Sequence, residues 1–197
     1  MKCQYLGDSY DAVKRMWQEL IFDWAPLYAE PQFLPHDIRQ DFTKLTRIPM
    51  LLSHPPGNFS ILNDPDTGIR LPGKTNQKEG RRHITIESII NQLRKGALCV
   101  ITFDQSDYRK SGLKRDQQRQ IKMRRLAEAG FYSFYYVSHA PFLFTVPNED
   151  AFHLIKNILK KAGIPEKRIE DCLERERDQI FILEKSVEST SFFRRED

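Results

Sequence analysis

Short apolar runs alternate with amphipathic segments through the middle of the chain, and this alternation restricts the fold more than any other feature of the sequence. Residues 97–104, ALCVITFD, form a nearly continuous apolar run of the kind that is buried on both faces of a sheet. Residues 85–96, TIESIINQLRKG, precede this run with helical periodicity and a closing glycine. Alternating strands and helices predict an α/β fold in three layers: a mostly parallel sheet, joined by right-handed crossovers, with helices on both faces.

The rest of the chain extends this pattern. Apolar and aromatic runs predict further strands at residues 26–30, 59–64, 131–138, 142–147 and 179–184. Amphipathic periodicity predicts further helices at residues 9–24, 35–46, 113–130 and 148–163, with N-caps at Ser9 and Asn148 and Pro35 in a first turn. The turn between residues 138 and 142 is too short for a crossover, so the strands that it joins should form an antiparallel pair near the C-terminal end.

Length and composition predict one domain. A chain of 197 residues with 40% hydrophobic residues supports a single core, and we assign residues 1–186 to one α/β domain and residues 187–197 to a flexible tail. No apolar run approaches the length of a membrane helix, and the first residues lack the apolar region of a signal peptide. Cys3, Cys99 and Cys172 are far apart and have no metal-ligand spacing. We therefore expect a cytoplasmic protein with reduced thiols and no membrane association; the sequence leaves its oligomeric state open.

Polar side chains follow three of the predicted strands. Asp64 and Asp66 come at the end of the strand at residues 59–64, and Asp104 and Ser106 come at the end of the apolar run ALCVITFD. His139 follows the aromatic strand FYSFYYVS. Because ligands of open α/β sheets bind outside the carboxyl ends of the strands, we expect these side chains to meet at one edge of the sheet.

The residue types at this edge suit a metal site. Asp64, Asp66 and Asp104 are predicted to hold Mg²⁺, because this ion takes oxygen ligands. Such an ion activates water and stabilises a phosphoryl transition state. His139, Asp66 and Ser106 are the predicted catalytic residues, with His139 as general acid or base because histidine exchanges protons near neutral pH.

Basic residues gather near the same edge in the sequence. They are concentrated at residues 81–83, 108–115 and 119–125. The net charge of +4 is modest, so the clustering, rather than the total charge, indicates a phosphate-bearing partner. Nucleic acid is the expected partner. The predicted phosphate ligands are Lys14, Arg109, Lys110 and Lys114.

Each of these features also has a purely structural interpretation. The segment DPDTG, residues 64–68, has the composition of a well-formed turn. Asp104 can cap a strand end, and His139 can be a hydrogen-bonded core residue. A run of positive charge is usually a solvated helix face, and Asp11 stabilises the positive end of a helix dipole. The sequence leaves these alternatives open.

Four segments resemble a family of uncharacterised bacterial proteins of about this length. They are YLGDSYDAVKR near the N-terminus, DPDTGI, FDQS and YYVSHAPFLF. In that family a G-D-x-x-D-x-x-K start, a D-P-D-[TN]-G centre and an S-H-x-x-F end recur in this order. The resemblance implies no known activity.

The chain is also distantly similar to the C-terminal half of class I methyltransferases. There a D-P-P-[YF] motif follows the fourth strand, and the sheet closes with an antiparallel pair. Asp64 and Pro65 match the first half of that motif, whereas Asp66 and Thr67 depart from the second half. A glycine-rich first loop is also missing, so S-adenosylmethionine is not an expected cofactor. A fold analogy of this kind does not assign a function.

Three functions follow from these observations. The expected one is metal-assisted phosphoester hydrolysis, nuclease-like, on nucleic acid or a nucleotide. The alternative is a non-catalytic, methyltransferase-like module that binds nucleic acid or a protein through the basic helix at residues 113–130. The last is a methyltransferase with a degenerate cofactor loop. The arrangement of the carboxylates at the sheet edge distinguishes the first function from the other two.

Overall fold

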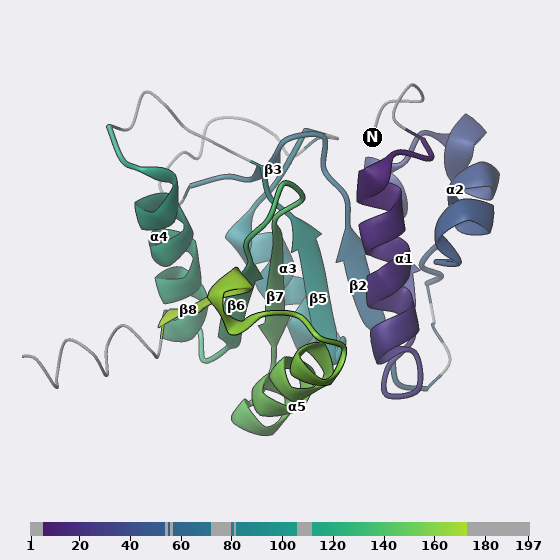
Figure 1. Ribbon diagram of the computed structural model, residues 1–197. Coiled ribbons are helices and arrows are strands. Elements are labelled where there is room, and N and C mark those ends of the chain that lie inside the picture. The colour runs from purple at the N-terminus through teal and green to yellow at the C-terminus, as the bar shows by residue number, and fades with distance from the viewer. Residues whose placement is uncertain are drawn as a thin grey trace, which may run out of the picture.

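The computed structural model describes residues 6–53, 55, 57–71, 80, 82–105 and 112–172 of the chain. At its centre is a six-stranded sheet with the strand order β1-β2-β5-β7-β6-β8 (Figure 1). Its strands are β1 (Leu27–Ala29), β2 (Ser60–Asn63), β5 (Cys99–Phe103), β6 (Tyr132–Tyr136), β7 (Phe142–Val146) and β8 (Ile169–Asp171). All of these strands except β8 coincide with runs predicted from the sequence, because a strand between two helix layers needs apolar side chains on both faces.

The strands of this sheet run in two directions. β1, β2 and β5 are parallel neighbours, whereas β7 is antiparallel to both β5 and β6, and β8 is antiparallel to β6. β1, β2, β5 and β6 therefore have their carboxyl ends at one edge, and β7 and β8 point the opposite way. The expected mixed α/β fold is confirmed. Antiparallel pairing extends beyond the expected hairpin because β7 inserts between β5 and β6 and β8 adds a further strand.

Helices pack against both faces of the sheet (Figure 1). α1 and α5 lie on one face, where Trp17 joins a hydrophobic cluster with Ile101 of β5. α3 and α4 lie on the other face, where Ile89 and Met123 join Val100 of the same strand. Adjacent residues of β5 thus face opposite cores, as the alternation of side chains along a strand requires. The helices are α1 (Ser9–Ile21), α2 (Arg39–Thr46), α3 (Ile86–Arg94), α4 (Arg115–Glu128) and α5 (Glu149–Lys161).

A second, two-stranded parallel sheet is formed by β3 (Gly68–Ile69) and β4 (His83–Ile84). The sequence does not predict these strands, because two residues are too few to show an alternation of apolar and polar side chains. β3 follows directly after the DPDT segment, so this small sheet fixes the chain that leaves the carboxyl end of β2.

Helix starts differ from the sequence prediction at two places. The N-cap of α1 is Asp8, not Ser9, and its carboxylate accepts two backbone N–H groups of the first turn. A carboxylate is favoured there because it also interacts with the positive end of the helix dipole. Pro35 precedes a 3₁₀ turn at His36–Ile38 and not the first turn of α2. The predicted N-cap of α5, Asn148, is confirmed.

Several predictions fall on parts of the chain that the structure does not describe. They are the strand at residues 179–184, the tail at residues 187–197, and the site residues Ser106, Arg109 and Lys110. In the ranges that are described, none of the helices combines the length and the apolar character that crossing a membrane requires.

Candidate functional site

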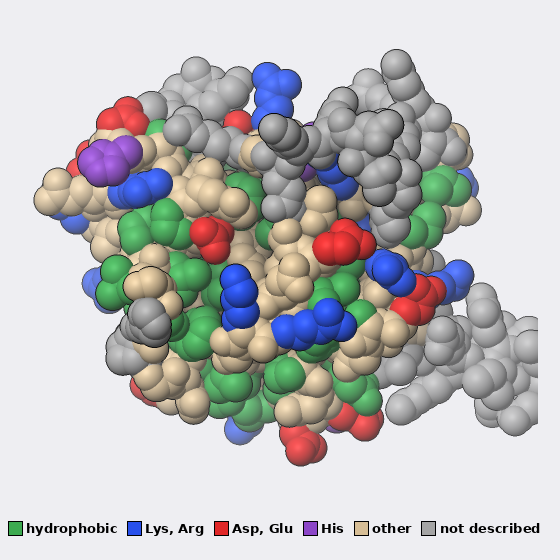
Figure 2. Space-filling model, turned by 180° about the vertical axis from the view of Figure 1, so that it is seen from behind, with side chains coloured by type: hydrophobic (Ala, Val, Ile, Leu, Met, Phe, Trp, Pro, Cys, Tyr) green, Lys and Arg blue, Asp and Glu red, His purple; other side chains and the backbone are tan. Residues whose placement is uncertain are grey.

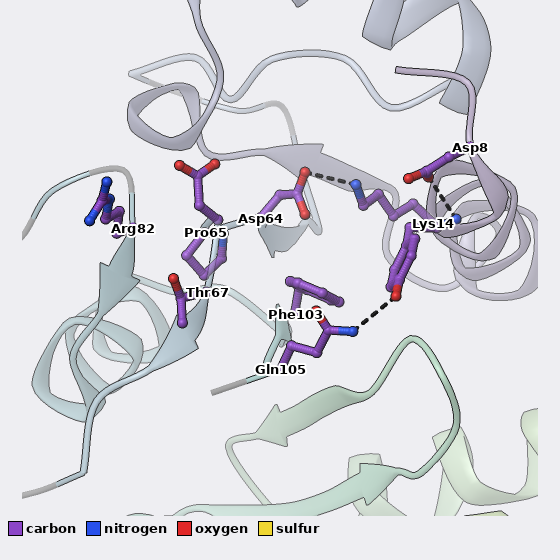
Figure 3. Close-up of a pocket in the computed structure, with 10 residues that line it drawn as sticks. Asp8, Lys14, Asp64, Pro65, Thr67, Arg82, Phe103 and Gln105 are labelled. Atoms are coloured by element: carbon purple, nitrogen blue, oxygen red, sulfur yellow. Dashed lines mark hydrogen bonds and ion pairs between the residues drawn. The ribbon is translucent and has the colours of Figure 1, made fainter. Parts of the chain in front are cut away.

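A pocket of about 490 Å³ opens at the carboxyl edge of β2 and β5, beside the start of α1 (Figure 3). This is the position at which open α/β sheets bind ligands, so the expected location at the carboxyl edge agrees with the pocket. Four chain segments surround it: the start of α1, the turn after β2, the residue before β4, and the end of β5. The lining residues are Asp8, Tyr10, Lys14, Asp64, Pro65, Asp66, Thr67, Arg82, Phe103 and Gln105.

Lys14 lies at the inner end of this pocket, between two carboxylates. Its Nζ donates to Asp11 Oδ1 at 2.9 Å and to Asp64 Oδ2 at 2.8 Å. The three side chains are only 3% to 6% exposed. Asp11 lies one helical turn before Lys14, and Asp64 reaches α1 because it shares the face of β2 on which Leu62 packs. Both carboxylates therefore bind the ammonium group of Lys14, which the sequence predicts as a phosphate ligand.

The ammonium form of Lys14 is retained despite its burial. Burial by itself lowers the pKa of the Lys14 amine, but Coulomb attraction to Asp64 and Asp11 and hydrogen bonds to both outweigh it. The resulting pKa is raised above the usual lysine value. Lys14 stays charged at neutral pH, and the Asp11–Lys14–Asp64 triad carries a net charge of −1.

Among the described residues that line the pocket, acidic side chains outnumber basic ones. Asp8, Asp64 and Asp66 line it against two cations, Lys14 and Arg82, and Asp11 stands directly behind Lys14. These six side chains carry a net charge of −2 when all are ionised. Figure 3 shows Arg82 and Lys14 on opposite sides of the pocket, with Asp64 between them. The hydrogen bond from Lys14 engages Asp64 Oδ2 and leaves Oδ1 for a further donor or cation.

Asp104 lies on the opposite face of the sheet from Asp64. Its Oδ2 accepts hydrogen bonds from Lys122 Nζ and Tyr135 Oη, both at 2.6 Å, and its Oδ1 accepts one from the backbone N–H of Ile69 at 2.9 Å. The carboxylate of Asp104 and the ammonium of Lys122 are each about 1% exposed. Asp104 is therefore held entirely by groups within the protein.

The register of the sheet explains this separation. Asn63 of β2 pairs with Thr102 of β5, so the next position places Asp64 opposite Phe103 and not opposite Asp104. Phe103 belongs to the cluster beneath α1, and the following residue, Asp104, turns toward α4. The structure thus brings Asp64 and Asp66 into one pocket and does not bring Asp104 to it.

Tyr135 depends on the same buried carboxylate. Burial, followed by the negative charge of Asp104, raises the pKa of the Tyr135 hydroxyl well above its usual value. A tyrosine whose pKa is higher in the folded than in the unfolded chain stabilises the fold below about pH 10 and loses that contribution as the pH rises through the folded pKa.

We therefore expect the free energy of unfolding of the wild type to fall more steeply above about pH 10 than that of Tyr135→Phe. Urea denaturation from about pH 8 to about pH 11 measures both slopes. Tyr28→Phe, at a half-buried tyrosine of β1, is the control and should keep the wild-type slope. Equal slopes for wild type and Tyr135→Phe would contradict the expected contribution.

Aromatic and amide groups form the wall between α1 and the end of β5. The ring of Tyr10 contacts those of Phe103 and His139, with centroids 5.6 Å and 5.5 Å away. Gln105 Nε2 donates to Tyr10 Oη at 2.9 Å and lies 3.3 Å from the carbonyl oxygen of His139. His139 itself is exposed, and its Nε2 lies 3.4 Å from Ser9 Oγ. The predicted general base is thus beside the pocket, behind Tyr10, and is not part of its lining.

Several basic side chains of helix α4 form ion pairs with carboxylates of the protein. Lys122 pairs with Asp104, Arg119 pairs with Glu170 at 2.6 Å, and Arg125 lies 3.1 Å from Glu128. Figure 2 shows Lys and Arg side chains interspersed with Asp and Glu on the face seen from behind. Lys114, the remaining predicted phosphate ligand among the described residues, is exposed at the N-cap of α4 and does not line the pocket.

Sequence reasoning does not identify the aromatic part of the site. Tyr10 and Phe103 contribute to the pocket wall. In the sequence they continue the apolar patterns of a helix and of a strand, and residues in such patterns are normally assigned to the core. Tyr10 lies inside the GDSYDAVK segment, and this position is the one signal that points to it. Arg82 belongs to a basic cluster, but nothing in the sequence shows that β4 brings it to the turn after β2.

The donor set at the pocket fits a hard divalent cation only in part. Asp64 and Asp66 present carboxylate oxygens, which Mg²⁺ prefers, and Mg²⁺ usually completes its shell with water. In the present arrangement, no three His, Cys, Asp or Glu side chains of the described residues lie close enough together to hold a metal ion.

Comparison with family models, curated proteins and solved structures gave no match to this chain.

Proposed function

We propose that this protein binds a nucleotide, or a nucleotide unit of nucleic acid, together with a divalent cation in the carboxyl-edge pocket, and hydrolyses a phosphoester there. One observation carries the proposal: carboxylates, an arginine and an aromatic wall line a single pocket at the edge where this fold class binds ligands. Each part suits a different part of a nucleotide. Arg82 suits a phosphate, and the rings of Tyr10 and Phe103 suit a base.

The charge of the pocket supports the involvement of a cation. A net charge of −2 on the six side chains described above repels a phosphate, so a phosphate ligand needs a positive partner. Asp64 and Asp66 would hold Mg²⁺, and Asp104 would not, because it faces the other side of the sheet. A bound Mg²⁺ would polarise a phosphoryl oxygen and generate hydroxide from water at neutral pH.

The protein side chains have separate tasks in this proposal. Arg82, opposite Lys14 in Figure 3, holds the phosphate by charge-assisted hydrogen bonds. Lys14 holds the carboxylate of Asp64 in place by a buried hydrogen bond. His139, the general acid or base in this proposal, is exposed and contacts the ring of Tyr10 beside the pocket.

The alternative, a module that binds nucleic acid through α4, has less support. Three basic side chains of that helix are engaged in ion pairs with Asp104, Glu170 and Glu128. Phosphate contacts by these side chains would require breaking interactions that already exist. Binding through the pocket requires no such rearrangement of α4.

Binding of a fluorescent mononucleotide, measured by anisotropy with and without Mg²⁺, tests the proposal. We expect Mg²⁺ to tighten binding about tenfold or more, Arg82→Gln to weaken it by a similar factor, and Asp66→Asn to remove the Mg²⁺ dependence. Arg94→Gln and Asp41→Asn make the same changes at exposed positions away from the pocket and should bind as the wild type does. Binding that is unaffected by Mg²⁺ and by both pocket variants would overturn the proposal.

A further inference from the structure

We infer that Asp104 is a positioning residue that holds one wall of the pocket in place from the opposite face of the sheet. The inference rests on the proposed function, because it names what arranges that binding site. Asp104 is not a lining residue of the pocket. It acts through the chain segment at residues 64–70, which we call the pocket strap.

The pocket strap crosses from one face of the sheet to the other over the end of β5. It begins at Asp64, which is bonded to Lys14 of α1 on the first face. Further along, the backbone N–H of Gln105 donates to the carbonyl oxygen of Thr67 at 3.1 Å. The strap then reaches the second face, where the N–H of Ile69 donates to Asp104 Oδ1 at 2.9 Å. The strap is thus fixed at both ends: the carboxylate of Asp64 bonds to α1 on one side of the sheet, and the carboxylate of Asp104 binds Ile69 on the other.

The strap carries groups that the proposed ligand needs. Asp66 and Thr67 line the pocket as part of it. Arg82 is attached to it through the backbone, because the N–H of Thr67 donates to the carbonyl oxygen of Arg82 at 2.9 Å. A shift of the strap therefore moves a carboxylate and the phosphate-binding arginine together.

Asp104 is itself held rigidly. Both of its oxygens are occupied, by three buried donors that come from β3, α4 and β6: Ile69 N–H, Lys122 Nζ and Tyr135 Oη. Gly68 lies so close to it that an added Cβ would be 2.3 Å from Asp104 Oδ1 and 2.8 Å from its Cα. The glycine of DPDTG and the aspartate of FDQS therefore form one contact, which links two motifs that are far apart in the sequence.

Asp104→Asn tests this role because asparagine cannot satisfy three donors. In one orientation its NH₂ faces Lys122 and Tyr135, and in the other it faces the N–H of Ile69, so a donor always meets a donor. We expect amide hydrogen exchange at Thr67 and Ile69 to accelerate about tenfold or more, and Mg²⁺-dependent nucleotide binding to weaken about tenfold.

The double variant Asp104→Asn with Lys122→Met provides a rescue. With the lysine removed, the asparagine oxygen accepts from Ile69 and its NH₂ donates to the hydroxyl oxygen of Tyr135. We expect this variant to regain most of the wild-type protection at Ile69 and most of the affinity, even though it carries two substitutions. A general loss of packing does not predict such a recovery.

Asp171→Asn is the matched control. Asp171 is also about 1% exposed and pairs with a lysine, Lys156, at 2.6 Å, but it lies in β8 away from the strap. We expect it to leave exchange at Ile69 and nucleotide affinity unchanged. Equal exchange at Ile69 in the wild type and Asp104→Asn would overturn the positioning role. Absence of nucleotide binding by the wild type would instead overturn the proposed function, and the exchange measurement would still decide the role of Asp104.

Discussion

Replacing Lys14 with methionine is expected to lower the free energy of unfolding by about 3–5 kcal/mol. The substitution leaves Asp11 and Asp64 facing each other in a buried site without the ammonium group that bonds to both. Two uncompensated carboxylates cost far more than the loss of one surface ion pair, because water cannot solvate them. Urea denaturation followed by tryptophan fluorescence measures the change.

Two further variants show whether the loss comes from the buried charges. Lys44→Met removes a lysine from an ion pair of the same i,i+3 spacing that is 65% and 60% exposed, and it should cost no more than about 1 kcal/mol. The triple variant Lys14→Met, Asp11→Asn, Asp64→Asn removes the charge of all three side chains, and it should be more stable than Lys14→Met alone. A triple variant that is less stable than Lys14→Met would contradict the assignment of the loss to unpaired carboxylates.

Replacing Gly68 with alanine is expected to lower the free energy of unfolding by about 3 kcal/mol or more. Two contributions add up: a steric collision of the new methyl group and an unfavourable backbone conformation. The new Cβ would lie 2.3 Å from Asp104 Oδ1 and 3.1 Å from the backbone nitrogen of Gln105. Asp104 cannot move aside, because its oxygens are bonded to Lys122 and Tyr135 in the core. In addition, Gly68 has a φ of +133°, which L-amino acids rarely adopt. Urea denaturation again measures the loss.

Gly96→Ala separates the steric contribution from the backbone contribution. Gly96 also has a positive φ, of +100°, but an added Cβ there has no heavy atom within 4 Å. It should therefore show only the cost of the backbone conformation, and the additional loss in Gly68→Ala measures the collision with Asp104. Equal losses in the two variants would mean that the contact between the strap and Asp104 tolerates an extra methyl group.

Much of the fold could be predicted from the sequence because its signals are local. The apolar run that becomes β5 and the amphipathic periods of α1, α3 and α5 can be identified within windows of about a dozen residues or fewer. The short strands β3, β4 and β8 were not predicted, because their residues, unlike the equally short LYA of β1, do not stand in an apolar or aromatic run. Their positions depend on partners elsewhere in the chain, such as the pairing of Gly68 with His83.

The candidate site could be predicted in location but not in composition. The rule that ligands bind at the carboxyl ends of strands points to the edge at which Lys14, Asp64 and Asp66 line a pocket. The rule says nothing about which face of the sheet each side chain takes. Asp104 was grouped with Asp64 because both end a strand, and the structure places them on opposite faces.

The sequence by itself determined the α/β class, the order of the main elements and the edge at which polar residues collect. These follow from apolar periodicity, which each segment carries alone. Only the tertiary structure decided which charges meet: Lys14 with Asp64 across 50 positions, and Lys122 with Asp104 on the other face. Those pairings depend on the register between β2 and β5, in which Asp64 follows opposite Phe103 and Asp104 comes one residue later. Neighbouring residues of a strand face opposite sides of the sheet.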